Sequence, residues 1–76
     1  MATQATEILA SAGRAWGGEH WQAPFARALG IDPRTLRAWL VGKSEPDPAV
    51  LERAEDLLTR RMCAISIARA HIRDFL

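Results

Sequence analysis

Glycine and proline residues divide this 76-residue chain into pieces that are each about the length of a helix. Within the pieces, apolar residues recur three and four positions apart, and no segment alternates apolar and polar residues over the length of a strand. Because glycine and proline punctuate helices, we predict an all-α fold, a small bundle of four to five helices. The predicted helices cover about residues 3–16, 22–29, 33–41 and 48–76.

Local signals set where the predicted helices begin. Pro24 is tolerated only in the first turn of a helix, so the second helix begins at residue 21 or 22. Asp32 is a suitable N-cap, because its carboxylate accepts hydrogen bonds from free N–H groups, and Pro33 then occupies the first helical position. The same Asp-Pro pair opens the last segment at residues 47–48.

The first predicted helix carries an apolar stripe that includes Ile8 and Leu9. Gly13 interrupts this helix and is expected to cost about 1 kcal/mol relative to alanine. Trp16 and Trp21 are expected to pack the helix against the two that follow.

Composition excludes several classes of protein. A single cysteine, Cys63, cannot form an internal disulfide and offers no familiar zinc spacing, so we expect neither a metal nor another cofactor. Neither His20 nor His71 has a partner group at catalytic spacing, and we expect no enzyme. There is no apolar leader or membrane-length apolar run, so we expect a single cytoplasmic domain over residues 1–76 and no membrane partner.

The charges are unevenly distributed although the formal net charge is only +1. Residues 27–43 are basic, residues 44–58 are acidic, and the end of the chain is basic again. Ordinary solvated helix faces would also give this pattern, so charge alone does not decide between function classes.

Residues 22–41 satisfy the demands of two helices joined by a tight turn. A small residue, Ala26, stands where the helices approach each other, and Gly30 accepts the left-handed backbone of the turn. The shared core is supplied by Leu29, Ile31, Leu36 and Trp39. This pattern predicts a helix-turn-helix whose second helix is free to enter a DNA major groove.

The segment resembles the Cro and lambda-repressor type of helix-turn-helix in residue kind and spacing. The matching positions are Gln22, Ala26, Gly30, Ile31, Leu36 and Trp39, followed by the Trp39–Gly42 ending. The resemblance is strong over about twenty residues and weaker over about fifty, and Pro24 departs from the commonest pattern. It implies a transcription regulator that binds specific sites in double-stranded DNA.

The resemblance also implies which residues face the groove. These are Pro33, Arg34, Arg37, Ala38 and Val41. Arg34 and Arg37 can each bond O6 and N7 of a guanine, although either one alone could equally hold a phosphate. Ala38 is suited to contact a thymine methyl group.

Phosphate contacts are expected at the edges of this surface. Gln22 matches the family position that bonds a phosphate, and the free N–H groups at the start of its helix favour the same contact. Thr35 and Lys43 are further candidates for phosphate contacts.

The last segment carries more apolar surface than three short helices can cover. Leu51, Leu58, Ile65 and Ile72 recur every seven residues, over one helix of about 40 Å or two helices bent near residues 60–63. We therefore predict that residues 48–76 form a dimerisation segment. Its candidate contact residues are Leu58, Met62, Ile65, Ile72, Phe75 and Leu76.

These features favour a dimeric repressor of a palindromic operator, with possible autoregulation, of the type found in phages and mobile elements. One alternative is an antitoxin-type regulator whose residues 63–76 bind a toxin. The other is a helical adaptor that binds a protein partner and has no role on DNA. The antitoxin hypothesis is distinguished by whether the last segment is ordered alone or only with a partner. The adaptor hypothesis is distinguished by salt dependence, because phosphate contacts make binding fall steeply with salt.

Overall fold

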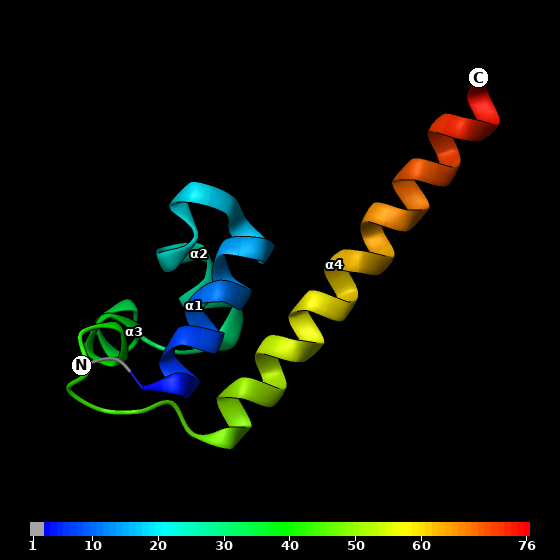
Figure 1. Ribbon diagram of the computed structural model, residues 1–76. Helices are drawn as coiled ribbons and strands as arrows, with labels where there is room; N and C mark the ends of the chain where they lie inside the picture. The colour runs from blue at the N-terminus through cyan, green and yellow to red at the C-terminus, as the bar shows by residue number, and fades with distance from the viewer. Residues whose placement is uncertain (1–2) are drawn as a thin grey trace.

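The computed structural model describes residues 3–76, which form four α-helices and one short 3-10 helix (Figure 1). The elements are α1 (Gln4–Gly17), η1 (Gly18–His20), α2 (Gln22–Leu29), α3 (Pro33–Leu40) and α4 (Pro48–Phe75). The predicted all-α fold is confirmed. The helix predicted to end at Val41 ends one residue earlier, because Val41 is the C-cap of α3.

Side-chain caps begin three of the helices. The Asp32 carboxylate accepts a hydrogen bond of 2.8 Å from the backbone N–H of Arg34 at the start of α3. At the start of α4, the Asp47 carboxylate accepts one of 3.0 Å from the N–H of Val50. The hydroxyl of Thr3 does the same for α1. Each cap satisfies an N–H group that has no partner within its helix, so the chain specifies where these helices start.

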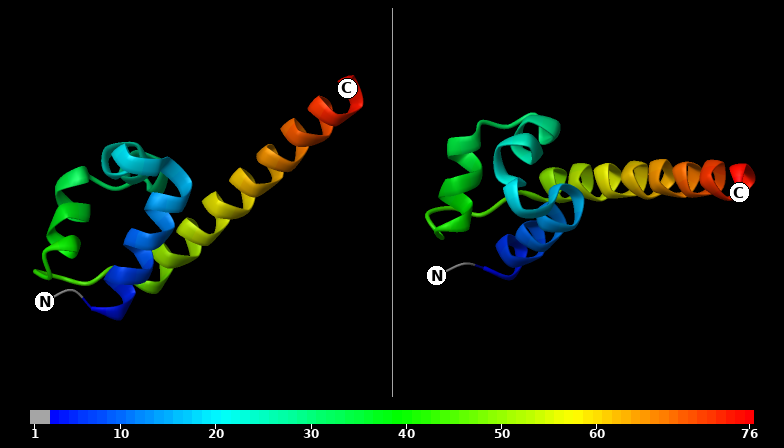
Figure 2. Two further views of the ribbon diagram at one scale, coloured as in Figure 1. Left: turned by 45° about the horizontal axis from the view of Figure 1, so that its top comes forward. Right: turned by 90° about the horizontal axis from the view of Figure 1, so that it is seen from above.

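The last segment is one unbroken helix rather than two. Helix α4 has 28 residues and is therefore about 42 Å long. It sets the long axis of a molecule that measures 50 × 22 × 20 Å. The first half of α4 lies beside α1, and the second half projects away from the other helices (Figure 2). Across residues 3–76, none of the helices combines the length and the apolar character that crossing a membrane requires.

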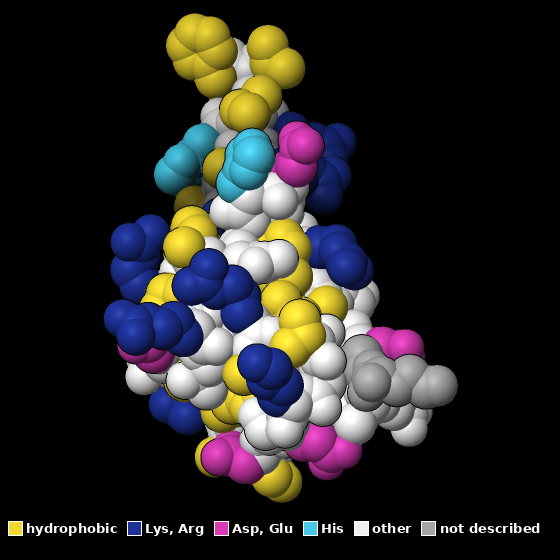
Figure 3. Space-filling view, turned by 90° about the vertical axis from the view of Figure 1, so that its left-hand side faces the viewer, with side chains coloured by type: hydrophobic (Ala, Val, Ile, Leu, Met, Phe, Trp, Pro, Cys, Tyr) yellow, Lys and Arg dark blue, Asp and Glu magenta, His cyan; other side chains and the backbone are white. Residues whose placement is uncertain are grey.

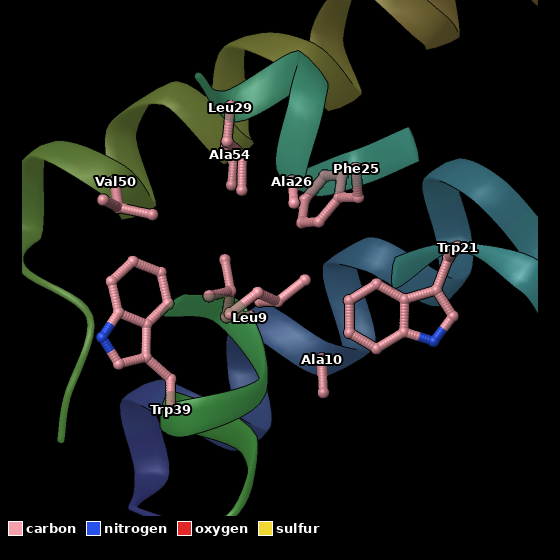
Figure 4. Packing of buried hydrophobic residues seen from close by; sticks show 10 residues of the cluster. Leu9, Ala10, Trp21, Phe25, Ala26, Leu29, Trp39, Val50 and Ala54 are labelled. Carbon is pink, nitrogen blue, oxygen red and sulfur yellow. The ribbon is translucent and has the colours of Figure 1, made fainter. Parts of the chain in front are cut away.

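The core lies where α1, α2, α3 and the first half of α4 meet. Its buried apolar residues are Leu9, Ala10, Trp21, Phe25, Ala26, Leu29, Leu36, Trp39, Val50 and Ala54. The indole of Trp39 points from α3 toward Leu9 and Val50, so it joins three helices (Figure 4). Phe25 contacts the rings of both Trp16 and Trp21, with centroid distances of 5.4 and 5.9 Å. The two tryptophans thus pack α1 against α2, as expected.

This packing requires Gly13. The prediction that Gly13 weakens α1 relative to alanine is therefore wrong. Gly13 is buried, and the ring of Trp21 lies directly over its α-carbon. A β-carbon added at this position would lie 2.0 Å from Cε3 of Trp21. Glycine is therefore the residue that lets the Trp21 indole reach the core.

The buried face of α1 also differs from the expected apolar stripe. Its centre is formed by Thr6, Leu9, Ala10 and Gly13. Ile8, which was expected in the stripe, is 55% exposed because it lies at the edge of this face, beside α4.

Replacing Gly13 with alanine is expected to lower the free energy of unfolding by about 1–3 kcal/mol, because the added methyl group overpacks the site beneath Trp21. Chemical denaturation followed by circular dichroism measures this loss. The control is Ala15→Gly at an exposed position of the same helix, where the ordinary preference for alanine predicts a loss of about 1 kcal/mol. A Gly13→Ala protein as stable as the parent would contradict the packing described here.

Candidate nucleic-acid interface

A left-handed glycine makes the turn between α2 and α3. Gly30 has φ 77° and ψ 28°, a conformation that costs glycine little. The N–H groups of Gly30 and Ile31 donate to the carbonyls of Arg27 and Ala26, at 3.1 and 3.0 Å. These bonds satisfy the end of α2 while the chain turns into α3.

Helix α4 holds the same turn from the other side. Nη1 of Arg53 donates a hydrogen bond of 3.0 Å to the backbone carbonyl of Leu29, the last residue of α2. This contact joins positions 24 residues apart. In the sequence Arg53 is only one charge within an acidic segment, and no local pattern around it indicates a partner in α2.

The inner face of α3 is buried and fixes the direction of the outer face. Leu36 and Trp39 lie in the core, whereas Arg34, Thr35 and Arg37 are exposed. The partly buried Pro33 and Ala38 and the exposed Val41 complete the helix surface. The face predicted to enter a groove therefore points away from the core.

The structure brings Gln22 close to the start and middle of α3. Gln22, Ala23, Pro33 and Arg37 line one shallow hollow of about 170 Å³ between α2 and α3. The predicted phosphate-binding residue and one predicted base-reading arginine thus share a surface. Their individual roles stay predictions.

Arg34 and Lys43 lie at opposite ends of α3. The Arg34 side chain is 86% exposed, and its Nε is 4.0 Å from the Asp32 carboxylate. An exposed ion pair at this distance contributes little to stability. The Arg34 side chain is therefore available to an external phosphate or base. Lys43 is exposed, and its backbone N–H donates to the carbonyl of Ala38 at 2.9 Å, which fixes the chain after the last turn of α3.

Several basic side chains are spread over the face that α3 presents. Figure 3 shows this face, with Lys and Arg side chains spread across it and acidic side chains toward its edges. Arg34, Arg37 and Lys43 are its exposed cations from α3 and the turn that follows. A surface of this kind is suited to a polyanion.

Two short helices with a shared buried face and an exposed basic second helix define the helix-turn-helix class of proteins. The family described as Helix-turn-helix matches residues 22–62, more than half of the chain, and the chain therefore belongs to this family. The resemblance to the Cro and lambda-repressor type is confirmed, and the protein is a DNA-binding transcription regulator of the XRE type. The family is one of regulators rather than enzymes. No curated protein and no solved structure matches the chain.

Replacing Arg53 with alanine is expected to lower the free energy of unfolding by about 0.5–1.5 kcal/mol, because the carbonyl of Leu29 loses its side-chain donor. Denaturant titration measures the change. Glu52→Ala alters the exposed neighbouring position and is expected to stay within about 0.5 kcal/mol of the parent. Equal losses in the two variants would show that the Arg53 contact does not stabilise the turn.

Proposed function

We propose that the protein is a homodimeric repressor that binds a palindromic operator and places α3 in the major groove of each half-site. The observation that carries this proposal is the orientation of α3. Leu36 and Trp39 are buried, and the opposite face exposes Arg34 and Arg37. The repressor would act by occupying DNA that polymerase must use, and its own promoter is one suitable operator.

In this proposal the arginines read the sequence. Each guanidinium presents a planar fork of donors that matches O6 and N7 of guanine. Ala38 is placed to contact a thymine methyl group, and Pro33 and Val41 border the same surface. Because α3 has only two turns, the few residues on its outer face carry the discrimination among sites.

Phosphate contacts fix the helix in the groove. Gln22 begins α2, which has no side-chain cap, so its first N–H groups are available to an anion. Thr35 and Lys43 lie on the exposed surface of α3 and just beyond its end. Contacts from these three residues set the register of α3 on the duplex without reading sequence.

The homodimer is proposed to form through the second half of α4. Every residue of the α4 tail, defined as residues 59–76, is exposed. Large apolar side chains on the tail are unusual for a monomer and suit an interface between two copies. With the half-buried Leu58 they form the α4 stripe, which consists of Leu58, Met62, Ile65, Ile72, Phe75 and Leu76. A twofold dimer places two α3 helices on half-sites about 10 bp, or a multiple of that spacing, apart.

The exposed tail also suits the antitoxin alternative, in which a toxin covers residues 63–76. The two readings differ in self-association, because an antitoxin tail needs its toxin rather than a second copy. The adaptor alternative differs in salt dependence, because only phosphate contacts release counterions.

Arg37→Ala and Arg34→Ala are each expected to weaken binding to the operator by about 1–3 kcal/mol, because a pair of hydrogen bonds to a base is lost. Both side chains are exposed, so the helical circular dichroism signal is expected to stay unchanged. The matched control is Arg60→Ala, since Arg60 is an exposed arginine of α4 whose partner is Asp56. Fluorescence anisotropy at two salt concentrations measures the affinities.

Three outcomes would count against this assignment. Unfolding of the arginine variants would show that their side chains face the core. An equal loss in Arg60→Ala would show only a general effect of charge. Binding that hardly changes with salt would favour the adaptor.

Ile65→Ala is expected to raise the dimer dissociation constant by about tenfold or more, because it removes apolar surface from the centre of the α4 stripe. Ile67→Ala is the matched control. Ile67 is equally exposed, at 57% against 53% for Ile65, but lies roughly 200° further round the helix. Sedimentation equilibrium measures both constants. Equal effects, or a parent protein that stays monomeric, would contradict dimerisation through this stripe.

A further inference from the structure

An apolar groove runs between α1 and α4, outside the DNA-facing surface. It has a volume of about 230 Å³ and is called here the α1/α4 groove. Its lining consists of Ile8, Leu9, Ala12, Leu51, Ala54, Glu55 and Leu58. Ile8 on its α1 side is more than half exposed, so this groove presents apolar surface that the fold itself does not cover.

The far end of α4 carries a large apolar side chain that the rest of the chain leaves exposed. Phe75 is 91% exposed, and Leu76 follows it. The tail cannot fold back into the groove of its own chain, because α4 is an unbroken helix. Leu58 and Phe75 are separated by about 25 Å along this helix. Phe75 can therefore reach an α1/α4 groove only if that groove belongs to a second molecule.

We propose that the α4 tails of two copies pair in antiparallel orientation, so that Phe75 of each copy occupies the α1/α4 groove of the other beside Leu58. This inference rests on the homodimer proposed above and adds its orientation, its register and the role of Ile8. The occupant of the groove is thus the α4 tail of a second copy of this chain.

Side-chain sizes along the α4 stripe fit this antiparallel register. Residues spaced three and four apart form the seam of a helix pair. When Leu58 lies opposite the partner's Phe75, Ile65 lies opposite the partner's Ala68, and each large side chain of the central layer faces a small one. A parallel pair instead places Phe75 against the partner's Phe75 and Ala68 against the partner's Ala68, and it leaves the α1/α4 groove open.

Charge favours the same orientation. Arg61 stands in the seam, with its guanidinium carbon 4.5 Å from the centre of the Trp16 ring of its own chain. A parallel pair would bring it against the partner's Arg61, and like charges in an interface are costly. An antiparallel pair places it opposite the partner's Ile72. The same orientation brings the basic end of one tail, with Arg73, toward Glu55 at the groove of the other copy.

Twofold symmetry doubles the contact. In an isologous dimer each groove receives one tail, so two grooves and the central seam are covered together. One arrangement therefore covers Ile8 and Leu58 at the groove together with Phe75 at the far end of α4, all of which are exposed or only partly buried in the monomer.

Disulfide cross-linking tests the orientation. The variants Glu55→Cys and Leu76→Cys are made in a Cys63→Ser background, and both changes lie on exposed positions. The proteins are mixed and oxidised. An antiparallel pair brings residues 55 and 76 of different copies together, so the 55–76 heterodimer is expected to be the main product. A parallel pair holds these positions about 30 Å apart, too far for a disulfide, and gives 76–76 dimers.

Sedimentation of Ile8→Ala gives an independent reading. The proposal predicts about a tenfold rise in the dimer dissociation constant, although Ile8 lies on α1 and outside the tail. Ile67→Ala serves again as the exposed control, and circular dichroism checks that each variant folds. Parent-like dimerisation of Ile8→Ala would overturn the docking of Phe75 in the groove.

The outcomes separate this inference from the proposed function. Dominant 76–76 dimers would overturn the antiparallel orientation and leave the homodimer standing. A monomeric protein that gives neither product would overturn the pairing itself and direct the tail to a different partner. Operator binding, measured on the same samples by anisotropy, reports separately on the role of α3.

Discussion

Burial of one face of α3 is the constraint on which the rest of the structure depends. An isolated helix of eight residues is not stable in water, so packing has to hold α3 in place. Leu36 and Trp39 provide that packing, and the Trp39 indole lies toward Leu9 of α1 and Val50 of α4. Because these side chains fix the rotation of α3, the opposite face with Arg34 and Arg37 is held outward.

Helix α4 does two different tasks along its length. Its first half completes the core through Val50 and Ala54, and Arg53 holds the end of α2 at the helix-turn-helix turn. Every residue of the α4 tail is exposed, although Arg61 near the start of the tail stacks on Trp16. One continuous helix therefore links the element that positions α3 to the surface proposed for dimerisation.

Local signals predicted most of the fold, because caps, breakers and apolar spacing act over a few residues. Asp32 and Asp47 mark helix starts, and Gly30 marks the turn. The sequence did not reveal the contacts that depend on distant partners. Gly13 makes room for Trp21 eight positions later, and Arg53 donates to Leu29 across 24 residues.

The sequence also predicted much of the surface that we propose faces DNA. The residue kinds and spacing from 22 to 41 predicted a helix-turn-helix, and the family match confirms it. The resemblance implied which α3 residues face the groove, and the burial of Leu36 and Trp39 agrees with an outward position for Arg34 and Arg37. It did not show that Gln22 and Arg37 line a common hollow, since that depends on how α2 and α3 cross.

Selection from a random library of duplex DNA with the purified protein tests the central claim most directly. The account predicts an inverted repeat with guanines at fixed positions in each half-site, bound much less tightly at high salt. No enrichment, or a site without symmetry and with little salt dependence, would contradict it.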